Sequence, residues 1–258
     1  MRIGGILFGT AVVFAAVCCF AGENEPAAGY VSPERLFSRG NDHYEKAEYG
    51  KAIDEYEKIP ALGYESASLY YNMAGAYFKA GRLGKAILNY ARAKRIMPRD
   101  ADITANDKFA RAMVKGEVIP EKGIWTWRPV RIYSRSFTVD ELTWLSSGLY
   151  VLIIVLLFIA VIRSDTNWYR LTGIVLLFVF ILFNSAVIWH KAGSMRRDGI
   201  TVVPRAEALF GPFDSATKFF TLNEGMRVTV IKAKDDWYKV RRADGKVGWV
   251  RKAEIEKI

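Results

Sequence analysis

Two long apolar blocks limit what this chain can fold into more than any other feature. They run from Leu142 to Ile162 and from Leu171 to His190, and each is almost free of charge. A helix rises ~1.5 Å per residue, so about 20 such residues cross the ~30 Å hydrocarbon core of a bilayer. The sequence therefore predicts two transmembrane helices, over residues 142–163 and 170–190.

The residues beside these blocks also fit a membrane hairpin. Thr138 and Glu141 have the spacing of a capping box at the start of the first helix. Aromatic residues typical of membrane interfaces lie near the ends of the blocks: Trp144, Trp168, Tyr169 and Trp189. Because only residues 163–170 separate the blocks, the two helices are expected to form a tight hairpin whose flanking segments share one side of the membrane.

Residues 1–21 have the pattern of a secretory signal peptide. Arg2 precedes an apolar run from Ile3 to Val17, and the small residue Ala21 precedes an acidic segment. Cleavage after Ala21 would remove the only two cysteines, Cys18 and Cys19. Two alternatives stay open: lipidation of Cys18 or Cys19, although neither follows a small residue, and an uncleaved anchor.

Two signals disagree about the side on which the soluble segments lie. A signal peptide exports the segment after Ala21, and the hairpin then returns the C-terminal segment to the same outer side. The distribution of basic residues favours the reverse, because the hairpin tip holds only Arg163 and Arg170 while the other side holds Arg128, Arg131, Arg135, Lys191, Arg196 and Arg197. We favour the signal peptide, since the first such element usually dominates.

Charge and composition exclude several classes of protein. The formal net charge is +10, but no segment of the chain is strongly basic. A nucleic-acid-binding protein would be expected to cluster its basic residues, so we expect no nucleic acid partner. The arginines near the membrane are expected to meet lipid headgroups. With two adjacent cysteines and only His43 and His190 beside them, a Cys/His zinc site is excluded. We expect no metal and no cofactor.

The segment before the hairpin repeats itself. Ala52, Ile53 and Tyr56 recur 34 residues later as Ala86, Ile87 and Tyr90. This period is the signature of tetratricopeptide repeats, in which small residues let paired helices cross closely. The sequence predicts an α-solenoid over residues 33–115, with two repeats and a capping helix at 102–114. The first copy departs from the family pattern at Arg39 and at His43.

Tetratricopeptide stacks bind peptides on the concave surface formed by the first helix of each repeat. Asparagine suits this role because its amide group both donates to and accepts from a peptide backbone. The predicted protein-binding groove consists of Phe37, Asn41, Tyr44, Tyr71, Asn72, Phe78, Lys79 and Asn106. The alternative is that these side chains are merely solvated or pack within the stack.

After the hairpin the pattern changes to short alternating strands, such as Arg227–Ile231 and Trp237–Val240. Turn signals separate them, and Asp244–Gly245 has the composition of a hairpin turn. Residues 116–141 form a juxtamembrane linker in this interpretation, and residues 200–258 form a small β barrel that resembles the bacterial SH3-like domain.

The barrel offers a second candidate surface. Trp237, Tyr238 and Trp249 could form an aromatic ligand face of the kind that binds peptides, or they could belong to the core and rim of the barrel. A further candidate is the long loop from Pro204 to Thr221, which carries Phe210, Phe213, Phe219 and Phe220.

The order of segments resembles the BatE family, the tetratricopeptide members of the bacterial aerotolerance (Bat) operon. That order is a signal peptide, tetratricopeptide repeats, a transmembrane hairpin and an SH3-like domain. The resemblance implies a bacterial inner-membrane protein whose soluble domains are periplasmic. It also implies a role in stress or oxygen tolerance and a complex with other membrane proteins, those that carry von Willebrand factor A domains.

No acid, base and nucleophile come together in the sequence, so we expect no enzyme activity. The carboxylates of Asp54, Glu55 and Glu57 fit a solvated helix face. Two functions remain: a membrane-anchored scaffold for protein–protein interaction, and a module that binds the cell wall, with peptidoglycan as the ligand of the SH3-like domain.

Overall fold

The computed structural model describes residues 31–116, 128–163, 168–195 and 197–258. The chain divides into two compact units, Met1–Ser32 and Pro33–Ile258, and every helix and strand described below belongs to the second unit. The predicted signal peptide and both cysteines lie outside the described residues, as do residues 117–127 of the predicted linker. The rest of that linker is largely helical, since α6 (Arg128–Ser136) and the start of α7 (Val139–Arg163) lie in it.

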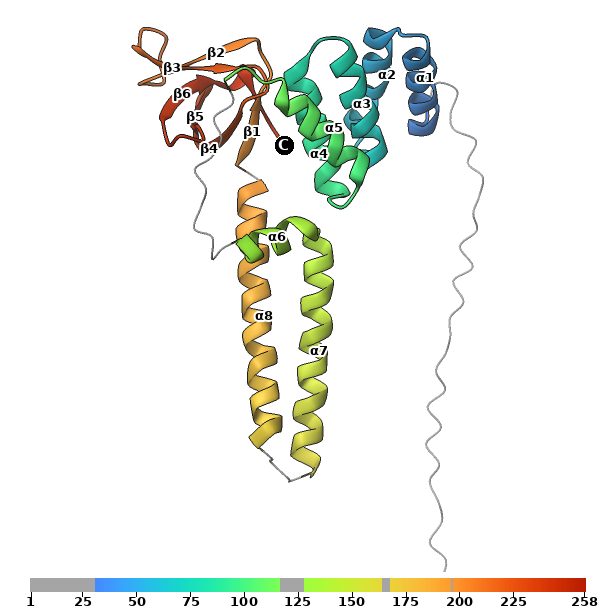
Figure 1. Ribbon diagram of the computed structural model, residues 1–258, viewed down its shortest axis with the longest axis vertical. Coiled ribbons are helices and arrows are strands. Elements are labelled where there is room, and N and C mark those ends of the chain that lie inside the picture. Colours follow the sequence, from blue (N-terminus) through green and yellow to red (C-terminus); the bar gives the residue numbers. More distant parts are fainter. Residues whose placement is uncertain (1–30, 117–127, 164–167, 196) are drawn as a thin grey trace, which may run out of the picture. The chain divides into compact units, whose positions relative to one another are not determined.

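Five helices form the segment before the membrane hairpin. They are α1 (Pro33–Glu45), α2 (Tyr49–Ala61), α3 (Ala67–Lys79), α4 (Leu83–Ile96) and α5 (Ala101–Ala112). Each helix packs against the next one (Figure 1). Side chains cap two of them, since Ser66 Oγ accepts from the Leu69 amide and Asp100 Oδ1 accepts from the Ile103 amide.

Small residues stand where the paired helices cross. Ala52, Ala74 and Ala86 are fully buried. A Cβ at Gly40 would lie 2.3 Å from Cε1 of Tyr56, so α1 and α2 approach as closely as they do only because Gly40 has no side chain. The helix pairs therefore follow the 34-residue spacing of the sequence, and their assignment to the tetratricopeptide family stays a prediction. Glu57 is exposed, as expected for a solvated helix face, and it also accepts a hydrogen bond from the Tyr77 hydroxyl.

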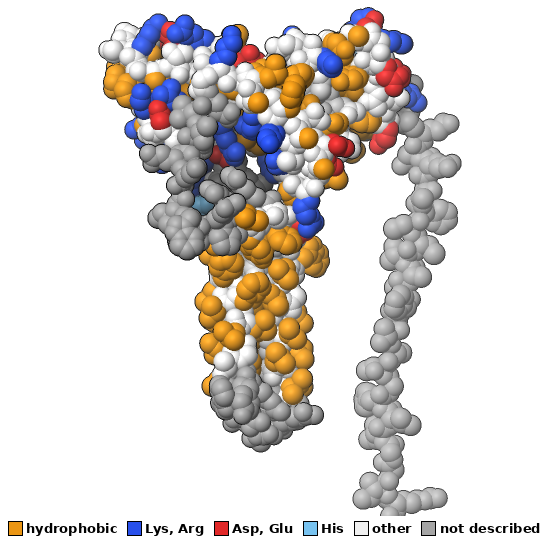
Figure 2. All heavy atoms as spheres, viewed as in Figure 1, with side chains coloured by type: hydrophobic (Ala, Val, Ile, Leu, Met, Phe, Trp, Pro, Cys, Tyr) orange, Lys and Arg blue, Asp and Glu red, His pale blue; other side chains and the backbone are white. Residues whose placement is uncertain are grey.

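Two long helices, α7 (Val139–Arg163) and α8 (Trp168–Met195), form an antiparallel pair. Each contains a stretch long and apolar enough to cross a bilayer, Val139–Ile159 and Leu171–Gly193, and hydrophobic side chains cover the visible face of the pair (Figure 2). The predicted capping box is present: Glu141 N donates to Thr138 Oγ1 at 3.1 Å, and Thr138 N donates to Glu141 Oε2 at 2.8 Å. Both helices extend beyond the predicted limits.

A short helix, α6 (Arg128–Ser136), precedes α7 and packs against α8. The Tyr133 hydroxyl donates to Oδ1 of the buried Asn184 at 2.7 Å. The Lys191 ammonium donates to the backbone oxygens of Ser134 and Phe137, at the end of α6. These bonds hold α6 against the C-terminal half of α8.

The C-terminal segment is one antiparallel sheet of seven strands. They are β1 (Asp198–Thr201), β2 (Arg205–Leu209), β3 (Lys218–Asn223), β4 (Arg227–Lys234), β5 (Trp237–Arg241), β6 (Val247–Arg251) and β7 (Ile255–Lys257). Their order in the sheet is β3-β2-β6-β5-β4-β1-β7. Gly245 has a φ of +85°, so the turn between β5 and β6 requires the predicted glycine.

The sheet packs against α4 through backbone and polar contacts. The Gly84 amide donates to Glu224 Oε1 at 2.8 Å, and a Cβ at Gly84 would lie 2.4 Å from the Thr201 carbonyl oxygen. The turn at Gly225, whose φ is +81°, lies against Ile87 and Val114. Because α4 precedes the hairpin and the sheet follows it, these contacts require both segments to lie on the same side of α7 and α8.

Candidate functional site

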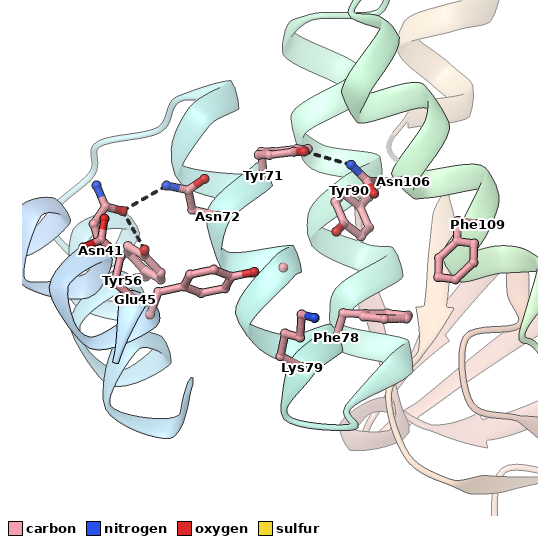
Figure 3. A pocket seen from close by; sticks show the side chains of 12 residues that line it. Asn41, Glu45, Tyr56, Tyr71, Asn72, Phe78, Lys79, Tyr90, Asn106 and Phe109 are labelled. Carbon is pink, nitrogen blue, oxygen red and sulfur yellow. Dashed lines mark hydrogen bonds between the residues drawn. The ribbon is translucent and has the colours of Figure 1, made fainter. Parts of the chain in front are cut away.

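A groove of about 490 Å³ runs across α1, α3 and α5. These three helices each begin a predicted repeat or cap, so their side chains share one face of the stack (Figure 3). The groove residues are aromatic or polar: Asn41, Tyr44, Glu45, Tyr56, Tyr71, Asn72, Gly75, Phe78, Lys79, Tyr90, Asn106 and Phe109.

Hydrogen bonds between neighbouring helices fix the polar part of the groove. Asn41 Oδ1 accepts from the Tyr56 hydroxyl at 2.7 Å and from Asn72 Nδ2 at 3.0 Å. At the next step of the stack, Asn106 Nδ2 donates to the Tyr71 hydroxyl at 2.8 Å. The groove thus presents amide groups whose positions are set before any ligand arrives, which reduces the entropy that binding must overcome.

An aromatic pair forms the other end of the groove. The rings of Phe78 on α3 and Phe109 on α5 lie 5.8 Å apart, centroid to centroid. Phe109 is 60% exposed, whereas the Phe78 ring beside it is half-buried. Lys79 follows Phe78 and is exposed. This end combines exposed apolar area with one positive charge.

Burial raises the pKa of three tyrosines that border the groove. Burial raises the pKa of Tyr56 and that of Tyr90 to about 12, because an apolar surrounding disfavours the phenolate. Burial also raises the pKa of Tyr44. These hydroxyl groups therefore remain neutral hydrogen-bonding groups, suited to a backbone amide more than to a cation.

Seven of the eight predicted groove residues line this groove. The exception is Phe37, which stacks against Tyr56 with 5.9 Å between ring centroids and does not line the cavity. Besides Gly75, which the repeat pattern places on the same face of α3, the groove is lined by four residues that sequence reasoning missed: Glu45, Tyr56, Tyr90 and Phe109. The two tyrosines recur at the repeat period, and their rings both pack in the stack and border the groove.

Asn72 uses one of its hydrogen-bond donors within the stack. Its amide nitrogen carries two N–H groups, and one of them donates to Asn41. That bond leaves the carbonyl oxygen and the second N–H of Asn72 to pair with a ligand. The Asn41–Asn72 pair therefore acts as one rigid unit and presents that oxygen in a fixed orientation.

The aromatic residues of the sheet are covered by cations of the same chain. Trp237 is buried, and the guanidinium of Arg251 lies 4.8 Å from its ring centroid. Lys239 lies 5.8 Å from the ring of the half-buried Trp249. Lys252 and Lys257 lie 5.6 and 5.0 Å from the ring of Tyr238. The strand register places Arg251 opposite Trp237 and Lys239 opposite Trp249.

The predicted loop from Pro204 to Thr221 is instead the β2–β3 hairpin, in which only residues 210–217 connect the two strands. This hairpin carries a separate aromatic cluster. Phe210 and Phe219 lie 4.4 Å apart between ring centroids, and Phe210 and Phe213 are 61% and 55% exposed. Phe220 differs, since it is buried and the Arg242 guanidinium lies 4.8 Å from its ring. The hairpin therefore exposes three of its four phenylalanines.

Comparison with known protein families identifies the C-terminal segment. A family model for the bacterial SH3 domain matches residues 211–256, from just after β2 into β7. The chain thus carries a bacterial SH3 domain at its C-terminal end. No curated protein matches the sequence.

Proposed function

We propose that this protein is a membrane-anchored adaptor whose helical groove binds an extended segment of a partner protein. The observation that carries the proposal is the open groove across α1, α3 and α5, with hydrogen-bonded amides at one end and, at the other, the half-buried Phe78 paired with the exposed Phe109. An extended peptide satisfies both ends, because its backbone pairs with amides and its apolar side chains cover exposed rings. The role is one of binding and not of catalysis.

The two apolar helices support the anchoring part of the proposal. The contacts between α4 and the SH3 domain support a topology in which both soluble segments lie on one side of the hairpin. We assign that side to the periplasm of a bacterial inner membrane, on two grounds: the signal-peptide pattern of residues 1–21, and the presence of a bacterial SH3 domain, which suits an extracytoplasmic location.

The partner class in this proposal is another membrane protein. The order of segments, which resembles the BatE family, supports a Bat-type complex with proteins that carry von Willebrand factor A domains and a link to stress or oxygen tolerance. A segment next to a partner's own membrane helix would reach a groove held close to the bilayer. Such a complex is tested by affinity purification of the full chain from native membranes.

Peptide selection tests the groove directly. A random peptide library is selected on the full-length protein in lipid nanodiscs, and Kd is measured by fluorescence anisotropy. Because Phe109 is 60% exposed, Phe109→Ala leaves the fold intact. It is expected to weaken the selected peptides about 10-fold, as the loss of ~1–2 kcal/mol of apolar burial requires.

The matched control is Phe213→Ala in the loop of the SH3 domain, where the ring is 55% exposed. This variant should bind the selected peptides as tightly as the unchanged protein. Equal affinity of the Phe109→Ala variant, or loss of binding in the Phe213→Ala variant alone, would contradict the assignment of the groove.

The bacterial SH3 match favours a second candidate function, binding to the cell wall. The exposed Phe210, Phe213 and Phe219 would supply the contact surface. Co-sedimentation of the full-length protein with purified peptidoglycan tests this function. A wall-binding module predicts sedimentation that Phe213→Ala reduces and Phe109→Ala leaves unchanged.

A further inference from the structure

The helical stack has two edges, which differ in composition. Its helices alternate in direction, so the connections 62–66 and 97–100 lie at one edge and the connections 46–48 and 80–82 lie at the other. The ion pair between Arg95 and Glu65, at 3.9 Å, joins the last turn of α4 to the connection 62–66. We call the edge formed by residues 62–66 and 96–100 the proximal edge, and the edge formed by 46–48 and 80–82 the distal edge.

Apolar side chains are exposed at the proximal edge. Leu62 is 46% exposed, Tyr64 51%, Ile96 37% and Met97 47%. The distal connections contain only Lys, Ala, Glu, Gly and Arg. Where α5 ends on that side, Val114 packs under Gly225 of the sheet, and only Met113 is an exposed apolar residue. Single exposed apolar residues are ordinary, but four on two adjacent connections form a patch.

The proximal edge is tied to the start of the first long helix. Arg99, in the connection after Met97, donates to Glu141, the residue that closes the capping box of α7. The Arg99 guanidinium also lies 5.6 Å from the ring of Phe137. Three residues beyond Glu141 stands Trp144, which is 79% exposed, as an aromatic residue at the headgroup level of a bilayer would be.

A second tie connects the same edge to the end of the other long helix. Arg95 donates to the backbone oxygen of Ile258 at 3.1 Å, and the Ile258 amide donates to the Asp198 carbonyl at 3.1 Å. Asp198 follows closely after α8, which ends at Met195, and Trp189 of α8 is 85% exposed. Both membrane-proximal ends of the hairpin therefore lie next to the proximal edge and not next to the distal one.

From this placement we propose that the proximal edge docks on the lipid bilayer, with Leu62, Tyr64, Ile96 and Met97 immersed at the boundary between headgroups and acyl chains. The proposal rests on the proposed membrane anchoring by α7 and α8. A bilayer accounts for the asymmetry, since it covers apolar side chains on the edge beside the hairpin and leaves the far edge in water. The helices that form the groove, α1, α3 and α5, then begin at the membrane surface and extend away from it.

Depth-dependent quenching of a fluorophore tests this docking. The full chain, with Cys18→Ser and Cys19→Ser, receives one cysteine at a time and an environment-sensitive NBD label. It is reconstituted in phosphatidylethanolamine–phosphatidylglycerol vesicles with or without lipid spin-labelled at acyl carbon 5. The test positions are Met97→Cys and Tyr64→Cys, on separate connections, so that a local effect of one label cannot decide the outcome.

Two further positions serve as references. Lys46→Cys on the distal edge reports the level of quenching in water, and Val155→Cys near the middle of α7 reports insertion of the hairpin. We expect quenching at positions 97 and 64 to exceed that at position 46 by ~3-fold or more, since interfacial side chains lie about 5–10 Å deep. Adding Arg99→Ala should reduce the quenching at position 97.

The outcomes separate the two proposals. Strong quenching at position 155 together with water-like values at both 97 and 64 would overturn the docking of the edge and leave the anchoring intact. Water-like values at position 155 would overturn the anchoring itself, and the docking with it. A blue-shifted label at position 97 without quenching by spin-labelled lipid would mean that protein, and not lipid, covers the edge.

Discussion

The helical groove and the aromatic face of the SH3 domain contain similar residues but differ in what covers them. In the groove, Phe78 and Phe109 pair with each other and Phe109 is open to solvent. On the SH3 domain, Arg251 covers Trp237 and Lys239 lies over Trp249. Aromatic content alone therefore does not locate a binding surface. The groove leaves the Phe109 ring open to solvent, whereas basic side chains of the same chain lie over the rings of the SH3 face, of which Tyr238 and Trp249 are half-buried.

Among the substitutions that test this comparison, Tyr56→Ala should have the largest effect on stability. The Tyr56 ring both borders the groove and fills the α1–α2 crossing at Gly40. Its side chain is fully buried. Tyr56→Ala is expected to destabilise the helical stack by about 3–5 kcal/mol, the range for loss of a buried aromatic ring. Denaturant unfolding followed by far-ultraviolet circular dichroism measures this. Tyr238→Ala, at a half-buried ring of the SH3 domain, should cost clearly less; equal costs would contradict the comparison.

The shape of the groove also depends on close helix crossing. Ala86 of α4 is fully buried where α3 and α4 cross. Ala86→Leu adds atoms where there is no room, so it should destabilise the stack by about 1–3 kcal/mol. The same unfolding measurement applies, with the exposed Asp54→Ala on α2 as the control. An unchanged midpoint for Ala86→Leu would show that the helices are not packed as described.

Alkaline pH should destabilise the helical stack more than the SH3 domain, by a smaller amount than the substitutions above. The unfolded chain loses its tyrosine protons near pH 10, whereas folding raises the pKa of Tyr56 and Tyr90 to about 12. Stability of the stack is therefore complete below pH 10 and falls as the pH rises through 12. Tyr56→Phe combined with Tyr90→Phe should flatten this dependence, and Tyr64→Phe, at an exposed position, should not. A slope that the double variant leaves unchanged would assign the effect to other groups.

Removing Arg251, the cation over Trp237, should have the smallest effect on the free energy of unfolding. Arg251 lies over Trp237 and pairs with the exposed Asp214. Arg251→Gln is expected to cost less than about 1 kcal/mol, because contacts of this kind near the surface are weak. Chemical unfolding followed by tryptophan fluorescence measures the change. A loss of several kcal/mol would mean that the cation holds the strands together and is not merely a cover.

Local patterns were enough to predict much of the fold. The 34-residue spacing of Ala52 and Ala86 predicted buried helix crossings, and Thr138 with Glu141 predicted the capping box. Gly245 predicted a turn because only a residue tolerant of positive φ fits there. Each of these signals lies within one element or between elements of the same kind, where sequence spacing translates directly into geometry.

Contacts between distant segments could not be predicted in this way. Gly84 binds Glu224, 140 residues later, and no spacing rule relates the two. Arg251 lies over Trp237 because the register of β5 and β6 places these two residues opposite each other. The alternating sequence pattern alone does not determine that register. Glu57 has the pattern of a solvated carboxylate, yet Tyr77 on the next helix pair donates to it. In the groove, seven residues followed from the repeat pattern, while Phe109 required the placement of α5.

Hydrogen–deuterium exchange tests the central claim most directly. The full-length protein in nanodiscs is compared with and without a peptide selected on it, region by region. Binding in the groove predicts slower exchange in α1, α3 and α5 and unchanged exchange in β4, β5 and β6. Protection confined to β4–β6, with α1, α3 and α5 unaffected, would contradict the account and assign ligand binding to the SH3 domain.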